Sequence, residues 1–246
     1  SRRWVARKAH FSSAVSQSGV TSPSCLKVCA SAEPPRRAWP PERSTNTSEE
    51  RPACLMSGVT VSENIERMGI RAASNCIVTY DNVRVTPDRV LGPVGKGFKI
   101  AMKTLDGGRI GIASQALGLA EGAINEAVKY TKERIQFGRR LSQFQNTQFQ
   151  LADMHTRTQA AQYLVYAAAM KKQNHEDYSM DAAMAKLFAA ETASDVTRRA
   201  VQLFGGYGYT REYPVERMMR DAKITEIYEG TSEVQRMVVA KYLGVN

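Results

Sequence analysis

The sequence predicts a mainly α-helical protein whose C-terminal part is an antiparallel helical bundle. Three observations carry this prediction. From Phe98 onward, apolar residues recur with helical spacing over three long stretches. The third stretch ends at Gly205–Gly206, as helices commonly end at glycine. Residues Ser1–Ser57, in contrast, hold 6 of the 9 prolines and no sustained apolar period.

The segment Ser1–Ser57 is expected to be irregular or disordered, because prolines at 34–35 and 40–41 interrupt helices and strands alike. Up to Ala32 it has no acidic residue and is rich in Arg and Ser, as mitochondrial transit peptides are. A non-native or misjoined leader is the favoured interpretation, and a transit peptide is the alternative. Cys25 and Cys29 lack a second ligand pair, which disfavours a zinc site.

The later elements follow in order. Residues 76–80 and 83–85 are expected to be strands around an Asp81–Asn82 turn. Helices are expected over 98 to about 136, over 145–172 and from Ser179, a candidate N-cap, to the stop at Gly205–Gly206. A short helix follows Pro214, and a last one runs from about 232 to 243. We therefore divide the chain into an irregular segment 1–57, a short β region 58–95 and a helical domain 96–246.

Apolar side chains at helical spacing are expected to mark one face of each long helix. On the first helix these are Ile100, Leu105, Ile112, Leu117, Leu119, Ile124 and Val128.

The net charge of +10 divides evenly between Ser1–Ser57 and the remaining residues, so the long helical part is only mildly basic. It shows no sustained Lys/Arg face with interleaved aromatics, which disfavours a nucleic-acid or acidic-membrane module. No window approaches 18 uninterrupted apolar residues, so no membrane span is expected. His10, His155 and His175 lack ligand spacing and a nucleophile motif, so no metal site is expected.

Glu229 stands out because it lies in a connection between two helices, followed by Gly230 and by Thr231 or Ser232 as candidate caps. A carboxylate on such a connection can project into a cavity. If the cavity is apolar, its pKa rises toward neutral pH, which suits a general base. The alternative is an ordinary solvated glutamate.

The residues around Glu229, Ile227 to Glu233 (IYEGTSE), closely resemble the C-terminal signature of acyl-CoA dehydrogenases. The likeness continues, in family order, in five further stretches: Leu105–Arg109, Arg134–Gly138, Gln145, Gln202–Gly206 and Glu212–Lys223. Together they span about residues 58–246 and are most similar in wording to the short-chain, butyryl-CoA dehydrogenase type.

This resemblance implies a flavin-dependent dehydrogenation of a short acyl-CoA to the trans-2-enoyl-CoA. It assigns the α-proton to Glu229 as general base and the hydride to FAD, with the Glu229 N–H helping to polarise the thioester carbonyl. Branched-chain and long-chain relatives carry the base at the position that is Gly108 here. A glycine cannot act as a base, so the resemblance leaves the role to Glu229.

The resemblance also implies binding residues. Substrate contacts fall on Asp106, Arg109 and Gly230, with an ordinary ion pair as the alternative for the first two. FAD contacts fall on Arg134, Phe137, Gln145, Gln202, Leu203, Phe204, Gly205, Gly206, Thr231, Ser232 and Glu233. The Gln202–Gly206 segment is expected to touch the FAD of a neighbouring subunit.

The implied partners are an acyl-CoA, an electron-transferring flavoprotein and further copies of the chain in a dimer or tetramer. The implied compartment is the cytoplasm, or the mitochondrial matrix as the alternative. Family members also have an N-terminal helical domain and a complete β-domain, neither of which is recognisable here. We therefore expect the chain by itself to bind FAD weakly or not at all, and a non-catalytic oligomerising bundle is the alternative function.

Overall fold

The computed structural model describes residues 58–245. These residues divide into two compact units, one of residues 58–65 and 74–85 and the other of residues 66–73 and 86–245. The expectations for Ser1–Ser57, including the leader, the transit peptide and the Cys25–Cys29 pair, lie outside the described residues.

The smaller unit is a two-stranded antiparallel sheet of β1 (Val59–Val61) and β2 (Val78–Tyr80), with Val59 opposite Tyr80. The expected strand over 83–85 was wrong, because the partner of β2 comes from upstream. A tight hairpin at Asp81–Asn82 needs a positive φ at both residues, and only Asn82 has one, at 49°. The Asp81 N–H instead donates to the Gly58 carbonyl at 2.8 Å, which extends the pairing with β1.

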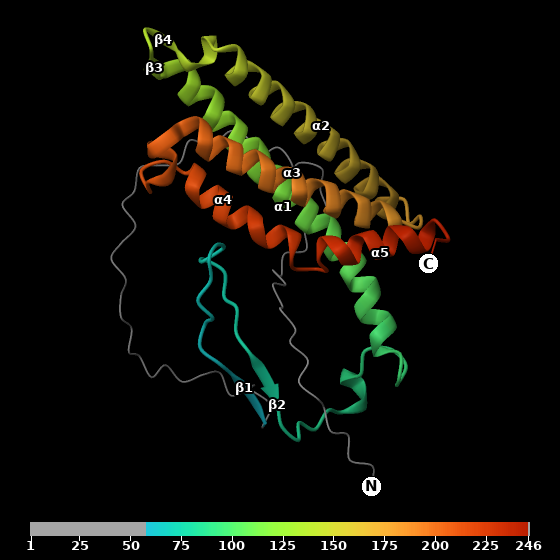
Figure 1. Cartoon of the computed structure of the whole chain (residues 1–246). Helices are drawn as coiled ribbons and strands as arrows, with labels where there is room; N and C mark the ends of the chain where they lie inside the picture. The colour runs from blue at the N-terminus through green and yellow to red at the C-terminus, as the bar shows by residue number, and fades with distance from the viewer. Residues whose placement is uncertain (1–57, 246) are drawn as a thin grey trace. The chain divides into compact units, whose positions relative to one another are not determined.

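The larger unit is an antiparallel bundle of three long helices, which confirms the predicted fold class (Figure 1). They are α1 (Gly97–Glu133), α2 (Gln145–Gln173) and α3 (Ser179–Phe204). A 3₁₀ turn, η2 (Pro87–Arg89), precedes them. Helix α3 is central, because it packs against α1, α2 and both of the shorter helices.

Helix α1 ends three residues earlier than expected, because the chain turns extended at Arg134. The following residues form a hairpin of β3 (Ile135–Gln136) and β4 (Arg139–Arg140). Its two turn residues, Phe137 and Gly138, both have a positive φ, as such a tight turn requires. A 3₁₀ turn, η3 (Leu141–Gln143), then leads into α2.

The core of the bundle is built mainly from alanine, whereas the expected apolar faces consist mostly of larger side chains. Fifteen of the 23 buried apolar residues are alanines. Of the seven residues expected on the apolar face of α1, only Leu117 and Ile124 are fully buried. Small side chains let the helix backbones approach closely, so the large neighbours lie along the edges of each seam.

The chain completes the unit with short elements. They are η4 (Gly205–Tyr209), α4 (Val215–Lys223), η5 (Ile224–Glu226) and α5 (Ser232–Tyr242). Helix α3 stops at Gly205, whose φ of 60° confirms the predicted glycine signal. Thr231 caps α5 by accepting from the Val234 N–H. Ser179 is not the cap of α3 as expected: it is the first helical residue, and its N–H donates to Asp177.

None of the helices in the described part of the chain has the length and apolar character needed to cross a membrane.

Candidate functional site

Glu229 lies in the short connection between η5 and α5, where the backbone is left-handed. Its φ is 56° and that of Gly230 is 92°. Position 230 favours glycine, because side chains rarely adopt a φ of 92°, and an added Cβ would also lie 2.8 Å from Nε2 of Gln235. A glutamate with positive φ is uncommon and costs about 1–3 kcal/mol, so the surroundings must hold it.

The Glu229 side chain points at helix α1, where Gly108 makes room for it. A Cβ built on Gly108 would lie 2.8 Å from Cδ of Glu229. Any larger residue at position 108 would therefore meet this carboxyl group. The two positions at which the resemblance places the base in different relatives are thus direct neighbours in this chain.

The carboxyl group is poised to accept a proton. Burial raises the pKa of Glu229, and the positive charges of Arg109 and Lys186 partly offset this rise. Its Oε2 atom is buried and has no hydrogen-bond partner within the described residues. The predicted rise in pKa on burial is therefore present, and a lone pair is free.

Arg109 and Asp106 form an ion pair on α1, with 2.6 Å between Nη1 and Oδ1. The other Asp106 oxygen accepts from the Ser179 hydroxyl at 2.7 Å, which ties α1 to the start of α3. Arg109 is buried, and its Nε has no partner within the described residues. Part of this guanidinium therefore stays available for a further acceptor.

Two residues of the site were missed by sequence reasoning. Lys186 on α3 and Gln235 on α5 are both fully buried. The Lys186 Nζ donates to the Gly230 carbonyl at 2.6 Å, and Gln235 Nε2 donates to the carbonyls of Glu229 and Gly230 at 3.1 and 2.9 Å. Lys186 could have been found, because it interrupts the alanine-rich buried face of α3 with a charge. Gln235 gave no such signal.

Tyr228, the residue before Glu229, is anchored on α1 because its hydroxyl donates to Gln115. Burial raises the pKa of Tyr228 to about 12, so this phenol stays protonated. The left-handed turn is therefore fixed from α1, α3 and α5.

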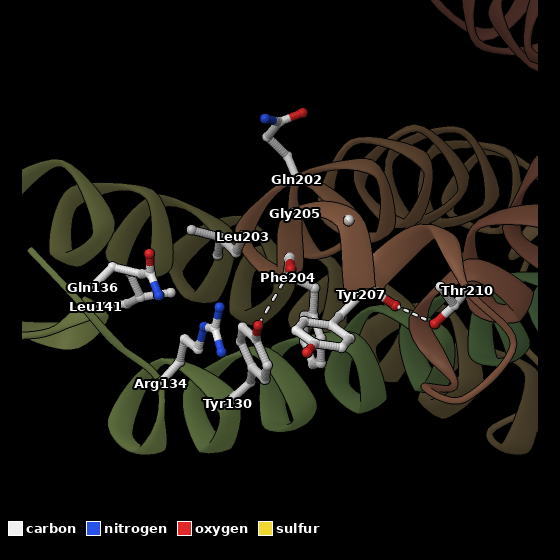
Figure 2. A pocket seen from close by; sticks show the side chains of 11 residues that line it. Tyr130, Arg134, Gln136, Leu141, Gln202, Leu203, Phe204, Gly205, Tyr207 and Thr210 are labelled. Atoms are coloured by element: carbon white, nitrogen blue, oxygen red, sulfur yellow. Dashed lines mark hydrogen bonds between the residues drawn. The ribbon is translucent and has the colours of Figure 1, made fainter.

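A second place of interest is a cleft of about 510 Å³ near the C-terminal end of α1. Figure 2 shows the side chains that line it. They are Tyr130, Arg134, Gln136, Leu141, Gln202, Leu203, Phe204, Gly205, Gly206, Tyr207 and Thr210. Six of the residues expected to contact FAD are thus brought together: Arg134 and the whole Gln202–Gly206 segment.

The cleft combines a cation with flat rings. The Arg134 guanidinium lies over the Tyr207 ring, with its Cζ 5.4 Å from the ring centroid. The Tyr130 ring stacks on Phe204 at 4.0 Å between centroids, and Tyr213 meets both edge-on. A Cβ added at Gly205 or Gly206 would meet no atom within 4 Å, so these glycines do not serve packing among the described residues. Figure 2 shows Gln202 extending away from the rings.

The other expected FAD contacts do not line this cleft. Phe137 lies at the tip of the β3–β4 hairpin and is 92% exposed, and Gln145 is exposed at the start of α2. Residues Thr231, Ser232 and Glu233 follow Glu229 at the start of α5. The Ser232 hydroxyl is buried without a partner among the described residues. Arg134, the residue just after α1, lies 26 residues beyond Gly108, which is about 39 Å at the rise of an α-helix.

The described residues contain no group of three or more His, Cys, Asp or Glu side chains that could hold a metal ion.

A helical bundle with a buried carboxylate on a left-handed turn is the class of protein that the fold and the site define. Residues 95–244 match the family model described as acyl-CoA dehydrogenase, C-terminal domain. The chain therefore belongs to the acyl-CoA dehydrogenase family, as the resemblance indicated.

Individual relatives agree with this assignment. The chain is 59% identical over 183 residues to the short-chain specific acyl-CoA dehydrogenase of Clostridium acetobutylicum, covering 74% of this chain and 48% of that protein. It is 47% identical over 186 residues to the caffeyl-CoA reductase-Etf complex subunit CarC of Acetobacterium woodii, covering 76% of this chain and 49% of that protein.

Among solved structures, butyryl-CoA dehydrogenase from Megasphaera elsdenii is similar with a TM-score of 0.76 and 53% identity. That match covers 77% of this chain and 50% of the other. The chain thus spans about half the length of the relatives that it matches.

Proposed function

We propose that the chain carries the proton-abstracting part of a flavin-dependent acyl-CoA dehydrogenase, which converts a short acyl-CoA to its trans-2-enoyl-CoA. The observation that carries this proposal is the Glu229 carboxyl group, which has a raised pKa and a buried, partnerless Oε2. A base of this kind combines a useful proton affinity with a free lone pair.

In this reaction Glu229 Oε2 takes the α-proton of the acyl chain, and the C–H electron pair forms the new double bond as hydride leaves the β-carbon. An α-C–H is too weak an acid unless the thioester carbonyl is polarised. Within the described residues, the Glu229 N–H donates to no acceptor, which supports its role as a hydrogen-bond donor to that carbonyl.

When bound, FAD supplies the acceptor for the hydride. The chemistry of the residues fits such a group. A guanidinium beside flat rings in the cleft suits a pyrophosphate and an adenine, and the orphaned Ser232 hydroxyl suits a second polar contact. Phe137, Gln145, Thr231 and Glu233 are proposed contacts by resemblance.

The separation of about 39 Å between Gly108 and Arg134 supports a division of these contacts between subunits. We infer that the Arg134 and Gln202–Gly206 cleft serves the FAD of a neighbouring copy, while Ser232 serves the chain's own. This arrangement requires a homo-oligomer, a dimer or tetramer. By the same resemblance, we assign residues 58–95 to the end of a β-domain and residues 96–246 to the helical domain.

Substrate contacts are proposed for Asp106, Arg109 and Gly230. The buried Arg109 Nε without a partner supports a role beyond the ion pair with Asp106. The electron acceptor is proposed to be an electron-transferring flavoprotein, in keeping with the name of the Acetobacterium woodii relative, an Etf complex subunit. The compartment stays a prediction: cytoplasm, or mitochondrial matrix.

The test uses a hybrid protein, because the chain spans about half the length of the relatives that it matches. In this hybrid, residues 58–246 are joined to the N-terminal half of the Clostridium acetobutylicum relative, and flavin reduction by butyryl-CoA is followed by the loss of the oxidised flavin's absorption. Glu229→Gln should slow flavin reduction by about two to four orders of magnitude and leave the binding of a product analogue nearly unchanged. A rate close to the unmodified one would mean that the base lies elsewhere.

The second candidate function for these 246 residues by themselves is a non-catalytic oligomerising bundle. It is considered because the chain spans 48% of the Clostridium acetobutylicum relative. Titration of the 246-residue chain with FAD distinguishes the two functions for the chain alone. We expect weak binding or none, and a stoichiometric yellow complex would contradict this expectation.

A further inference from the structure

Lys186 is a charged residue in a place that normally excludes charge. Its side chain is fully buried on the face of α3 that is otherwise formed by alanines. The hydrogen bond that its Nζ makes within the described residues goes to the Gly230 carbonyl at 2.6 Å. Burying an ammonium group costs several kcal/mol, about the scale of a protein's net stability. Packing alone therefore does not explain a lysine at this position.

The Gly230 carbonyl that Lys186 holds is also held from a second helix. Gln235 Nε2 donates to it at 2.9 Å and to the Glu229 carbonyl at 3.1 Å. Both side chains are fully buried, so water does not compete for these bonds. Gln235 on α5 thus holds the carbonyls of both Glu229 and Gly230, and Lys186 on α3 holds the second of them as well.

These carbonyls belong to the strained part of the backbone. Glu229 has a φ of 56° and Gly230 a φ of 92°. A strained backbone of this kind persists only where its surroundings over-determine it. The conformation matters because it directs the Glu229 carboxyl group at Gly108, with Cδ only 2.8 Å from the Cβ position of that residue.

We infer that Lys186 is a positioning residue: through the Gly230 carbonyl it fixes the left-handed turn that aims Glu229, and its charge acts on the same carboxyl group. This inference rests on the proposed function of Glu229 as the base. Lys186 touches neither substrate nor flavin in this role, and acts through the backbone beside the base.

The charge of Lys186 acts among several others. Glu226 in η5, Glu229 in the turn and Glu233 on α5 favour its protonated form, whereas Arg109 on α1 opposes it. Burial is the largest influence and lowers the pKa of Lys186 to about 8. The group is therefore mostly charged at neutral pH, and its charge lowers the pKa of Glu229 against the rise caused by burial.

The test uses two substitutions in the 246-residue chain. Lys186→Met keeps the volume of the stem and removes both the donor and the charge, and Lys186→Gln keeps a donor without the charge. In Lys186→Met the Gly230 carbonyl keeps its hydrogen bond from Gln235, and no buried ammonium group has to be desolvated, so this variant is expected to fold. Lys129→Met, an exposed lysine on α1, is the matched control.

The readouts are the Glu229 pKa, from ¹³C NMR titration assigned with Glu229→Gln, and the amide exchange of residues 228–231. Lys186→Met should raise the Glu229 pKa and speed exchange in the turn at least tenfold, with exchange in α1–α3 unchanged. Lys186→Gln should raise the pKa in the same way but restore part of the protection. In the hybrid protein, Lys186→Met should lower kcat about 100-fold with little change in KM, because a small misplacement of a catalytic group has an effect of this size.

The inference is overturned if both variants leave the Glu229 pKa and turn exchange at the control values. If a variant unfolds more easily but the Glu229 pKa does not change, the inference is also overturned. Lys186 would then have only a structural role. If Lys186→Met does not fold, the Lys186→Gln result decides alone. The pKa and amide-exchange readouts need no flavin, so they stand apart from the proposed function: Glu229→Gln tests the base, and the lysine variants test what positions it.

Discussion

Glu229 on the turn before α5 and Gly108 on α1 share one space, since an added Cβ at Gly108 would lie 2.8 Å from the Glu229 Cδ. A carboxylate projecting from either position would reach the same region. This relationship is compatible with the implication of the resemblance that the base can stand on either element.

The shared space predicts the result of exchanging the two residues in the hybrid protein. Glu229→Gly with Gly108→Glu should recover part of the flavin reduction that Glu229→Gly alone abolishes. Glycine is the suitable residue at 229, because a glutamine there would still fill the space that the new side chain needs. Gly108→Glu alone should be impaired, since two carboxyl groups would be crowded together. Equal rates for the double variant and Glu229→Gly would contradict the prediction.

The raised pKa of Glu229 predicts a pH-dependent stability difference. Burial makes the folded chain bind this proton more tightly than the unfolded chain. Glu229 thus favours the folded state at low pH, and this contribution is lost as the pH rises through its folded-state pKa. Glu229→Gln has no such loss, so its stability relative to the unmodified chain should increase between about pH 4 and about pH 8. Urea unfolding at both pH values measures the difference.

Glu233 provides the control for that measurement, because its pKa shifts in the opposite direction. Hydrogen bonds from its own backbone and from Thr231 lower it. Glu233→Gln should therefore lose stability relative to the unmodified chain as the pH rises. If both variants showed the same trend, the trend would not report on Glu229.

The cap of α5 predicts a modest effect on stability. Thr231 accepts from the Val234 N–H at 3.4 Å, and loss of such a cap typically costs about 1 kcal/mol. Thr231→Ala should therefore lower the free energy of unfolding by about that amount, whereas Thr231→Ser should keep most of it. Chemical denaturation of the two variants makes the comparison, and equal stabilities would show that the hydroxyl does not act as a cap.

The aromatic stack behind the cleft predicts a larger effect. Phe204 is 3% exposed and stacks on Tyr130 at 4.0 Å. Phe204→Ala should cost about 3–5 kcal/mol, as truncation of a buried phenylalanine does. The same truncation at Phe137, which is 92% exposed, should change stability by no more than about 0.5 kcal/mol. Urea unfolding separates the two, and similar losses would argue against a packing role for the stack.

The helical part of the fold was predictable because its signals are local. Helical periodicity, the glycine stop at Gly205 and the cap at Thr231 each depend on a few neighbouring residues. The strand pairing of β1 with β2 was not predictable, since it joins segments about 17 residues apart and the intervening residues carry no strand pattern. The local turn signal at Asp81–Asn82 was stronger than any signal for the β1–β2 pairing, and it wrongly indicated a strand over 83–85.

The site was predictable only in part, for a related reason. Glu229 stood out through its sequence neighbours, and the cleft residues Arg134 and Gln202–Gly206 through resemblance. Lys186 and Gln235 act on Glu229 through space from other helices, so no spacing along the chain connects them to it. The alanine core was hard to predict for the same reason, because how closely two helices approach depends on the side chains of both helices.

The left-handed backbone at Glu229 has a consequence for how this position changes over generations. Selection for folding alone would favour glycine or asparagine there, because glutamate gains nothing from the strained conformation. A lineage that kept the bundle but gave up proton transfer would therefore drift away from glutamate at 229, while Gly230 and the alanine seams stayed as they are. Because the resemblance allows a base at either position, residues 108 and 229 read together separate inheritance of the architecture from inheritance of the proposed chemistry.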